Sequence, residues 1–243
     1  KMAHLRVDFR SEVMDMNTSM TVILPEQKKL DNTKVVYLLH GLADNCTGWS
    51  RYTSVERYAR EKDVALVIPE VQRSFYADML NGLDYFSFIN DELHRICQNF
   101  FGFADKRENR YVMGLSMGGY GALKCALTSP DEYSGCAAFS SVADIEKTVF
   151  SSNDGRKKEF EAIFGSSIPN SSNLFKLIDK AEDIPPVFLA CGEEDPRIIH
   201  SEEMYLALKE KGVPVEYSHW TGEHNWIFWD AAVKKAFDYF FKG

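Results

Sequence analysis

The chain has 243 residues and a formal net charge of −8 at pH 7, from 28 basic and 36 acidic side chains. Hydrophobic residues make up 45% and charged residues 26%, which excludes disordered, collagen-like and coiled-coil proteins and fits one globular domain over residues 1–243. The acidic balance argues against nucleic acid as a partner, because phosphate backbones bind basic surfaces. The sequence also contains no apolar run of about 18 residues that could span a membrane.

Strand-like segments recur along the chain. Residues 4–10 alternate polar and apolar side chains with period two, and residues 20–24 form a second strand-like run that Pro25 ends. The apolar run at residues 35–39 is typical of a strand covered on both faces, as in a parallel sheet. The same type of run recurs at residues 65–68, 110–115, 135–139, 186–190 and 215–218.

Helical patterns lie between these runs. In two segments, apolar residues recur at spacings of three and four, which places them on one helical face. The first set is Tyr85, Ile89, Leu93, Ile96 and Phe100, and the second is Trp226, Trp229, Val233, Phe237 and Phe240. Alternating strands and helices indicate right-handed crossovers. We therefore predict an α/β protein with a mostly parallel central sheet and helices on both faces.

Residues 144–183 break this alternation. The segment is polar and contains three pairs of serines together with Asn153, Pro169 and Asn170. It is too long for a plain connecting loop, so we expect an insertion with short helices of its own. Because the segment leaves the sheet at the carboxyl end of a strand, where open α/β sheets bind ligands, a lid or substrate wall is favoured over a simple surface excursion.

The cysteines and histidines give no pattern of a metal or cofactor protein. The five cysteines include no Cys-x-x-Cys pair, and residues 1–10 lack the apolar core of a signal peptide, so we expect free buried thiols and a cytoplasmic protein. His219 and His224 lie five residues apart across a turn, which does not match a zinc motif. Neither a phosphate loop nor a dinucleotide fingerprint occurs. We predict no metal and no cofactor.

The strongest local signal is Gly114-Leu115-Ser116-Met117-Gly118, which follows the strand-like run from residue 110 and precedes an apolar helix at residues 122–127. A strand-to-helix turn around G-x-S-x-G holds the serine in a strained conformation that exposes its hydroxyl. The helix directs its unpaired N–H groups and its positive end towards Ser116. This context favours a serine nucleophile.

A serine nucleophile needs a base, which in this fold class comes last in the chain order Ser, acid, His. Three histidines follow Ser116. His200 falls in a predicted helix and His219 in a predicted strand, whereas His224 lies in the loop before the last helix. A base that must reach both the serine and the leaving group is expected on such a loop, so His224 is the predicted base.

The acid is expected after the strand-like run at residues 186–190. Glu193, Glu194 and Asp195 follow that run. Asp195 is favoured because a glycine makes the turn before it and a proline stiffens the loop after it, but spacing alone does not exclude the two glutamates. The carboxylate would hold the imidazole tautomer and stabilise the imidazolium without taking the proton.

The tetrahedral intermediate of acyl transfer needs two backbone N–H donors. Met117, the residue after the serine, is expected to supply one of them. The other is expected after the third strand, where His40-Gly41-Leu42 stands, so the N–H of Leu42 is the second predicted donor. His40 is interpreted as a structural hydrogen-bonding residue and not as a second base.

The chain also resembles the esterase D and S-formylglutathione hydrolase superfamily, and within it the bacterial tributyrin esterases. The resemblance covers about residues 5–240 and rests on His40-Gly41-Leu42 with Trp49, Gly82-Leu83-Asp84-Tyr85, the run from Gly114 to Ala122, Cys191 to Asp195, and Glu223-His224-Asn225-Trp226. It implies an α/β-hydrolase fold with Ser116, Asp195 and His224 as nucleophile, acid and base. It also implies oxyanion donors at Leu42 and Met117 and selects Asp195 over its glutamate neighbours. The insertion matches the family motifs least.

These observations together predict a serine carboxylesterase that acts through an acyl-enzyme on esters of a short acyl group, acetyl first, or of an aromatic one, feruloyl or cinnamoyl. The expected partner is a small-molecule or carbohydrate-linked ester, and a homo-oligomer is compatible with the sequence. Four aromatic residues on predicted loops at strand ends are interpreted as substrate-binding, because flat rings stack on sugar or cinnamoyl groups, although ordinary packing explains them equally well: Trp49, Phe75, Tyr76 and Trp226.

Three alternatives remain open from the sequence. The same residues would hydrolyse the thioester S-formylglutathione, or they would pass the acyl group to a sugar as related mycolyltransferases do. A binding module that has the hydrolase fold but no activity is the third alternative, and the presence of all three predicted catalytic residue types in order argues against it.

Overall fold

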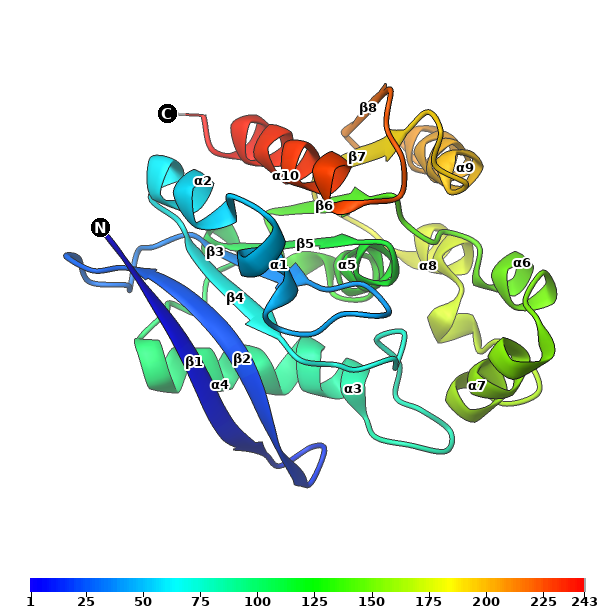
Figure 1. Ribbon diagram of the computed structural model, residues 1–243, viewed down its shortest axis with the longest axis horizontal. Helices are drawn as coiled ribbons and strands as arrows, with labels where there is room; N and C mark the ends of the chain where they lie inside the picture. The colour runs from blue at the N-terminus through cyan, green and yellow to red at the C-terminus, as the bar shows by residue number, and fades with distance from the viewer. Residues whose placement is uncertain (243) are drawn as a thin grey trace.

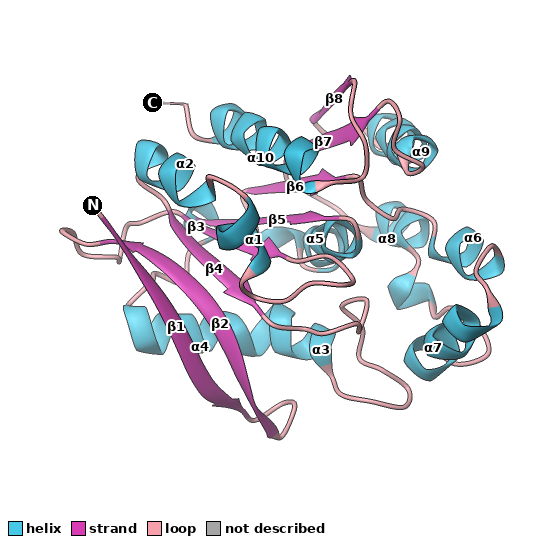
Figure 2. Ribbon diagram, viewed as in Figure 1, coloured by secondary structure: helices cyan, strands magenta, loops and turns pink. Residues whose placement is uncertain are grey.

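This computed structural model describes residues 1–242. Their central element is an eight-stranded sheet. Helices cover both of its faces (Figure 1), and Figure 2 shows the same layers coloured by type of element. The strand order is β1-β2-β4-β3-β5-β6-β7-β8. The strands are β1 (Met2–Ser11), β2 (Met16–Pro25), β3 (Val35–Leu39), β4 (Ala65–Pro69), β5 (Arg110–Leu115), β6 (Gly135–Phe139), β7 (Val187–Gly192) and β8 (Val215–Trp220).

The sheet is parallel from β4 to β8 and antiparallel at the β1–β2 edge. Runs of apolar residues locate β3, β5 and β6 at the bounds that the sequence predicts, because these strands are buried on both faces. β1 and β2 extend beyond the predicted runs, since they pair along their whole length, from Met2 opposite Pro25 to Ser11 opposite Met16. The predicted α/β fold with a mostly parallel sheet is confirmed.

Alternation along each strand divides the apolar side chains between two cores. In β3, Val35, Tyr37 and Leu39 pack on one face, with the helices that follow β4 and β5. Val36 and Leu38 pack on the other face, against the first two helices and the last helix. Period-two alternation produces this division, since successive side chains of a strand point to opposite faces.

The helices that cover the second core are α1 (Gly48–Tyr52), α2 (Val55–Lys62) and α10 (Trp226–Phe240). The remaining helices are α3 (Tyr85–Ser87), the π-helix η1 (Phe88–Glu92), α4 (Leu93–Phe101), η2 (Arg107–Asn109), α5 (Met117–Thr128), η3 (Pro130–Glu132), α6 (Ile145–Phe150), α7 (Asp154–Phe164), η4 (Asn170–Ser172), α8 (Leu174–Lys180) and α9 (Ile198–Glu210).

The predicted helix between residues 85 and 100 is interrupted by the π-turn η1. The N–H of Leu93 bonds to the carbonyl of Phe88, which places one more residue in that turn than the helical period assumes. The displaced register leaves Phe100 55% exposed, although the sequence places it on the buried face. The same turn buries Glu92, which accepts hydrogen bonds from the Ser11 hydroxyl at 2.5 Å and the Glu12 N–H at 2.7 Å.

Residues 144–183 form the short helices α6, α7, η4 and α8, as the sequence predicts. In Figure 1, α6 and α7 lie on the side of the molecule opposite the β1–β2 hairpin. Phe160 and Ile163 of α7 and Leu174 and Ile178 of α8 are buried in the core that lies over α5. The last part of the segment therefore packs as an ordinary layer helix, and a lid role for the first part stays a prediction.

All five cysteines are free and buried. Burial raises the pKa of the Cys97, Cys125 and Cys191 thiols to about 12, so these thiols are protonated at neutral pH. Within residues 1–242, no helix has the length and apolar character needed to cross a membrane. The same residues contain no group of three or more His, Cys, Asp or Glu side chains arranged to hold a metal ion.

Two glycines allow the start of α5 to pack closely, Gly118 against the end of β3 and Gly114 of β5 against α5. A Cβ on Gly118 would lie 2.3 Å from the Leu39 carbonyl oxygen and 2.7 Å from that of His40. A Cβ on Gly114 would lie 2.2 Å from the carbonyl oxygen of Gly118. Both obstacles are backbone atoms that cannot rotate away. The two outer positions of the G-x-S-x-G motif therefore require glycine for packing.

Gly118→Ala is expected to lower the free energy of unfolding by about 1–3 kcal/mol, the usual cost of forcing extra volume into a packed site. Gly155→Ala is the matched control, because the nearest atom to a Cβ there lies 3.5 Å away in ordinary contact. In helix α7 the control is expected to raise stability by about 0.5–1 kcal/mol. Urea denaturation of both variants measures the difference, and equal stabilities would contradict the packing account.

Candidate active site

Ser116 occupies the sharp turn between β5 and α5. Its backbone has φ 52° and ψ −115°, a conformation with positive φ that is rare outside glycine. Its N–H is fixed by a 2.8 Å hydrogen bond to the carbonyl of Phe139 in β6. α5 begins at the next residue, Met117, so its positive end lies at the serine. The strand, the turn and the helix are arranged as the motif predicts.

His224 and Asp195 complete a hydrogen-bonded chain with Ser116. His224 Nε2 lies 3.0 Å from Ser116 Oγ, and His224 Nδ1 lies 2.9 Å from Asp195 Oδ2. His224 is on the loop between β8 and α10, and Asp195 is on the loop between β7 and α9. The three side chains that the sequence selects thus come together from three separate loops at the carboxyl end of the parallel sheet.

Asp195 is almost completely buried, with 1% of its surface exposed. Burial acts to raise the pKa of its carboxyl group, but hydrogen bonds from His224, from the Ser140 hydroxyl and from the Arg197 N–H outweigh burial and lower that pKa. The Arg197 N–H lies 2.7 Å from Asp195 Oδ1. The carboxylate therefore stays ionised and is able to hold the Nδ1–H tautomer of His224.

Ser140 and Trp229 extend this chain, and the sequence analysis did not identify either in this role. Trp229 Nε1 donates to Ser140 Oγ at 3.0 Å. The Trp229 ring also packs edge-on against the His224 imidazole, with ring centroids 5.0 Å apart. Ser140 directly follows β6 and has a φ of 47°. Its position just after a strand, at the edge of the sheet where ligands bind, is the one feature of the sequence that indicates a role in the site.

The rival residues have other partners. Glu193 Oε1 lies 3.0 Å from His219 Nδ1 on the exposed surface, and Glu194 Oε2 accepts the Gly222 N–H at 2.5 Å. His200 Nδ1 faces the N–H groups of residues 143 and 144 at 3.2 Å each. It accepts from both, which makes it a neutral structural residue. None of these side chains hydrogen-bonds to Ser116 or to His224.

The β3–α1 loop presents a free amide beside the serine. His40 Nδ1 donates to the Gly41 carbonyl at 2.7 Å, while His40 Nε2 accepts the Val71 N–H at 3.1 Å. Because N–H and C=O point in opposite directions in a trans peptide, holding the Gly41 carbonyl turns the Leu42 N–H the other way. Gly41 itself lies close to the serine, since a Cβ added there would be 3.8 Å from Ser116 Cβ.

Within residues 1–242, neither the Leu42 N–H nor the Met117 N–H is used in a hydrogen bond to the protein. Met117 is the first residue of α5, where the N–H has no partner inside the helix. Leu42 lines the cleft above Ser116. Both predicted donors are therefore available to an oxygen atom placed beside the serine.

Trp49 and Tyr76 hold this loop from behind and do not face the cleft. Trp49 Nε1 donates to the Leu39 carbonyl at 3.0 Å, and the Tyr76 hydroxyl donates to the His40 carbonyl at 2.9 Å. Both side chains have 0% of their surface exposed, and Phe75 has 3%. The interpretation of these three as substrate-binding is corrected: they are core residues.

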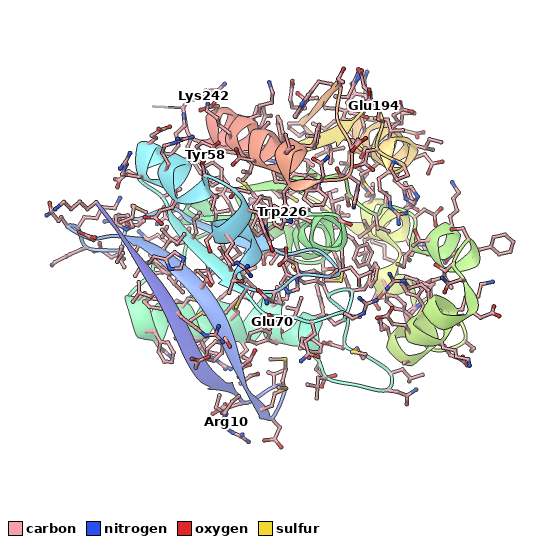
Figure 3. The ribbon with its side chains drawn as sticks, in the orientation of Figure 1. Arg10, Tyr58, Glu70, Glu194, Trp226 and Lys242 are labelled. Carbon is pink, nitrogen blue, oxygen red and sulfur yellow. The ribbon has the colours of Figure 1, made fainter. Side chains whose placement is uncertain are left out.

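A cleft of about 480 Å³ opens over the serine. Its lining includes Leu42, Asp44, Leu115, Arg197, His224, Trp226 and Trp229. Of the four aromatic residues that the sequence analysis placed at the substrate, Trp226 lies in this lining. Figure 3 labels it where the first turn of α10 meets α1. Its ring centroid lies 5.1 Å from that of Tyr52, which is 50% exposed.

Comparison with known proteins agrees with this geometry. A family model described as "Putative esterase" matches residues 11–240. An acetyl esterase of Caldicellulosiruptor saccharolyticus is 30% identical over 99% of both chains. Among solved structures, the fluorophosphonate-binding serine hydrolase FphF of Staphylococcus aureus, in a substrate-bound form, is 31% identical with a TM-score of 0.91, covering 100% of this chain and 99% of its own.

The S-formylglutathione hydrolase FrmB of Staphylococcus aureus is 32% identical, has a TM-score of 0.89 and is covered over 100% of both chains. These relatives match along their whole length, and the resemblance read from the sequence motifs is confirmed. The chain belongs to this esterase family, has the α/β-hydrolase fold and is a serine hydrolase of carboxylic esters.

Proposed function

We propose that Ser116, His224 and Asp195 carry the ester hydrolysis and that the N–H groups of Leu42 and Met117 hold the oxyanion. The observation that carries this assignment is the continuous hydrogen-bonded chain, 3.0 Å from Ser116 Oγ to His224 and 2.9 Å from His224 to Asp195. Nucleophile and base at such distances, with a third group orienting the base, are the arrangement that nucleophilic catalysis requires. The N–H groups of Leu42 and Met117, which have no partner within the described residues, support their assignment as the oxyanion donors.

The reaction follows from these positions. His224 Nε2 takes the proton of Ser116 as Oγ attacks the ester carbonyl, and the resulting oxyanion is held by the two N–H groups. The tetrahedral intermediate collapses, the C–O bond to the alcohol breaks, and His224 gives its proton to the leaving oxygen. Water then attacks the acyl-enzyme with His224 again as base, which releases the acid and restores Ser116.

We further propose short acyl groups, acetyl above all, as the substrate class. The acetyl esterase that is 30% identical over 99% of both chains supports this choice. The correction of Trp49, Phe75 and Tyr76 removes three of the four rings that favoured an aromatic acyl group, which leaves Trp226. The substrates are therefore small or carbohydrate-linked acetyl esters.

Ser116→Ala is expected to lower kcat for 4-nitrophenyl acetate by at least about 10⁴-fold. Serine, histidine and aspartate act as one unit, and without the serine only the oxyanion donors and substrate binding accelerate the reaction. The wild-type serine should also be labelled by a fluorophosphonate, and the variant should not. Ser141→Ala is the control, because Ser141 is buried nearby and bonds to the Val142 carbonyl at 2.9 Å. Undiminished hydrolysis by Ser116→Ala would refute the mechanism.

A panel of matched substrates tests the acyl class. Turnover of 4-nitrophenyl acetate is compared with that of the butyrate, decanoate and ferulate esters and with S-formylglutathione. We expect kcat/KM for acetate to exceed that for decanoate by at least about 10-fold, since a long acyl chain crowds the packed lining of the cleft and such overpacking costs about 1–3 kcal/mol. Faster turnover of the thioester or of the ferulate than of any acetyl ester would contradict the proposed acyl class.

Tyr76→Phe is expected to lower kcat by about 10-fold with little change in KM, because the loop that aims the Leu42 N–H loses one of its anchors and an oxyanion donor acts in the transition state. The free energy of unfolding should also fall by about 1–3 kcal/mol, since the His40 carbonyl is left buried without its donor. Steady-state kinetics and urea denaturation measure the two effects.

Tyr239→Phe in α10 serves as the control for the loss of a hydroxyl, because its oxygen makes no hydrogen bond within the described residues. An unchanged kcat in Tyr76→Phe would show that the loop is held without this anchor.

A further inference from the structure

Arg197 brings a positive charge into the cleft. It directly precedes α9, and its side chain lines the same cleft as Ser116 and His224. The residue is half-buried. Its backbone N–H is used by Asp195, but its guanidinium forms no ion pair or hydrogen bond with any residue from 1 to 242. The guanidinium has no role in the proposed mechanism.

The acidic side chains on the same loop are already engaged. Glu193 faces His219 Nδ1 at 3.0 Å, and Glu194 accepts the Gly222 N–H. Asp195 is turned inward to His224 at 2.9 Å. Thus each carboxylate of the loop has another partner, and none approaches the Arg197 guanidinium within 4 Å.

A second group of arginines lies where the insertion meets the loop after β4. Arg73 and Arg156 both pair with Glu159, so that two guanidinium groups share one carboxylate. Burial lowers the pKa of the Arg197 guanidinium, and the nearby positive charge of Arg156 lowers it further. The negative charge of Asp195 acts to raise it. Arginine nevertheless stays charged, so the cleft holds a permanent cation.

A partly desolvated guanidinium without a partner is costly, and its planar donors fit a carboxylate. We propose that Arg197 is a specificity residue that binds a carboxylate on the ester substrate, carried by either the acyl group or the alcohol. This proposal rests on the proposed function. It assigns the site to esters of dicarboxylic acids or acetyl esters of hydroxy acids, with Arg197 as the binding group although Asp44 also lines the cleft.

Two pairs of matched esters test the proposal and separate the two positions of the carboxylate. For the acyl side, the mono-4-nitrophenyl ester of adipic acid is compared with 4-nitrophenyl hexanoate. For the alcohol side, 3-acetoxybenzoate is compared with neutral 3-acetoxybenzamide. The measured quantity is the ratio of kcat/KM for the anionic ester to that for the neutral ester, after subtraction of the uncatalysed rate.

In Arg197→Gln this ratio is expected to fall by at least about 10-fold for one of the two pairs, mainly through KM, because hydrogen bonds to charged groups are worth a factor of that size. Arg197→Lys should give an intermediate ratio, since it keeps the charge but loses the planar fork. The wild-type ratio should fall with added salt. Arg95→Gln, an exposed arginine on α4 with the same charge change, should retain the wild-type ratio.

A ratio in Arg197→Gln equal to that of the wild type for both pairs would overturn the proposal. Should that variant fail to fold, a salt-independent wild-type ratio together with an unchanged ratio in Arg197→Lys would overturn it. A different result would refute the proposed function itself: hydrolysis of the neutral esters that is absent in the wild type, or that persists in Ser116→Ala. Neutral hydrolysis that depends on Ser116, with an unchanged ratio, would refute the role of Arg197 alone.

Discussion

The close approach of two backbone segments, the start of α5 and the end of β3, is the constraint on which the site depends. Gly118 lies where a Cβ would be 2.3 Å from the Leu39 carbonyl oxygen. This contact sets the start of the helix that follows Ser116 beside the loop that contains Leu42. Any side chain at this position would separate the two amides that are proposed to hold the oxyanion. The parallel sheet makes the contact possible, because β3 and β5 are neighbouring strands.

Three successive carbonyl groups at the end of β3 are each held by a buried donor. Trp49 binds that of Leu39, Tyr76 that of His40, and the His40 ring that of Gly41. Donors that are fixed before the substrate arrives need no reorganisation during the reaction, and this is the source of most electrostatic stabilisation in enzymes. In the proposed mechanism, the buried aromatic residues therefore act on the reaction through the backbone and not by contact with the substrate.

The sequence predicts the parts of this structure that depend on local pattern or on a motif with a fixed mechanism. Continuous apolar runs locate β3, β5 and β6 because burial on both faces leaves no other pattern for them. The order of serine, acid and histidine, with the family resemblance that chose Asp195 over its glutamate neighbours, selects three side chains that the fold joins by hydrogen bonds of 3.0 and 2.9 Å.

Side-chain direction was not predictable in the same way. Phe75 and Tyr76 follow a strand, as ligand-binding residues often do, but their φ angles of 50° and 48° turn both rings into the core. A positive φ at an aromatic residue has no sequence signature. Likewise, nothing in the sequence shows that Arg197 lacks a partner, since its neighbours Glu193 and Glu194 would serve as partners in a model based on spacing alone.

The three carbonyl anchors have a consequence for how such an enzyme diversifies. They lie behind the loop, in the core, whereas Leu42, Trp226 and Arg197 present their side chains to the cleft. The Leu42 amide belongs to the backbone and is unaffected by the identity of its own side chain. Substitutions of Leu42 or Arg197 can therefore change which ester is accepted while the proposed donors keep their positions, whereas Trp226 is tied to the anchors because its ring centroid lies 5.4 Å from that of Trp49.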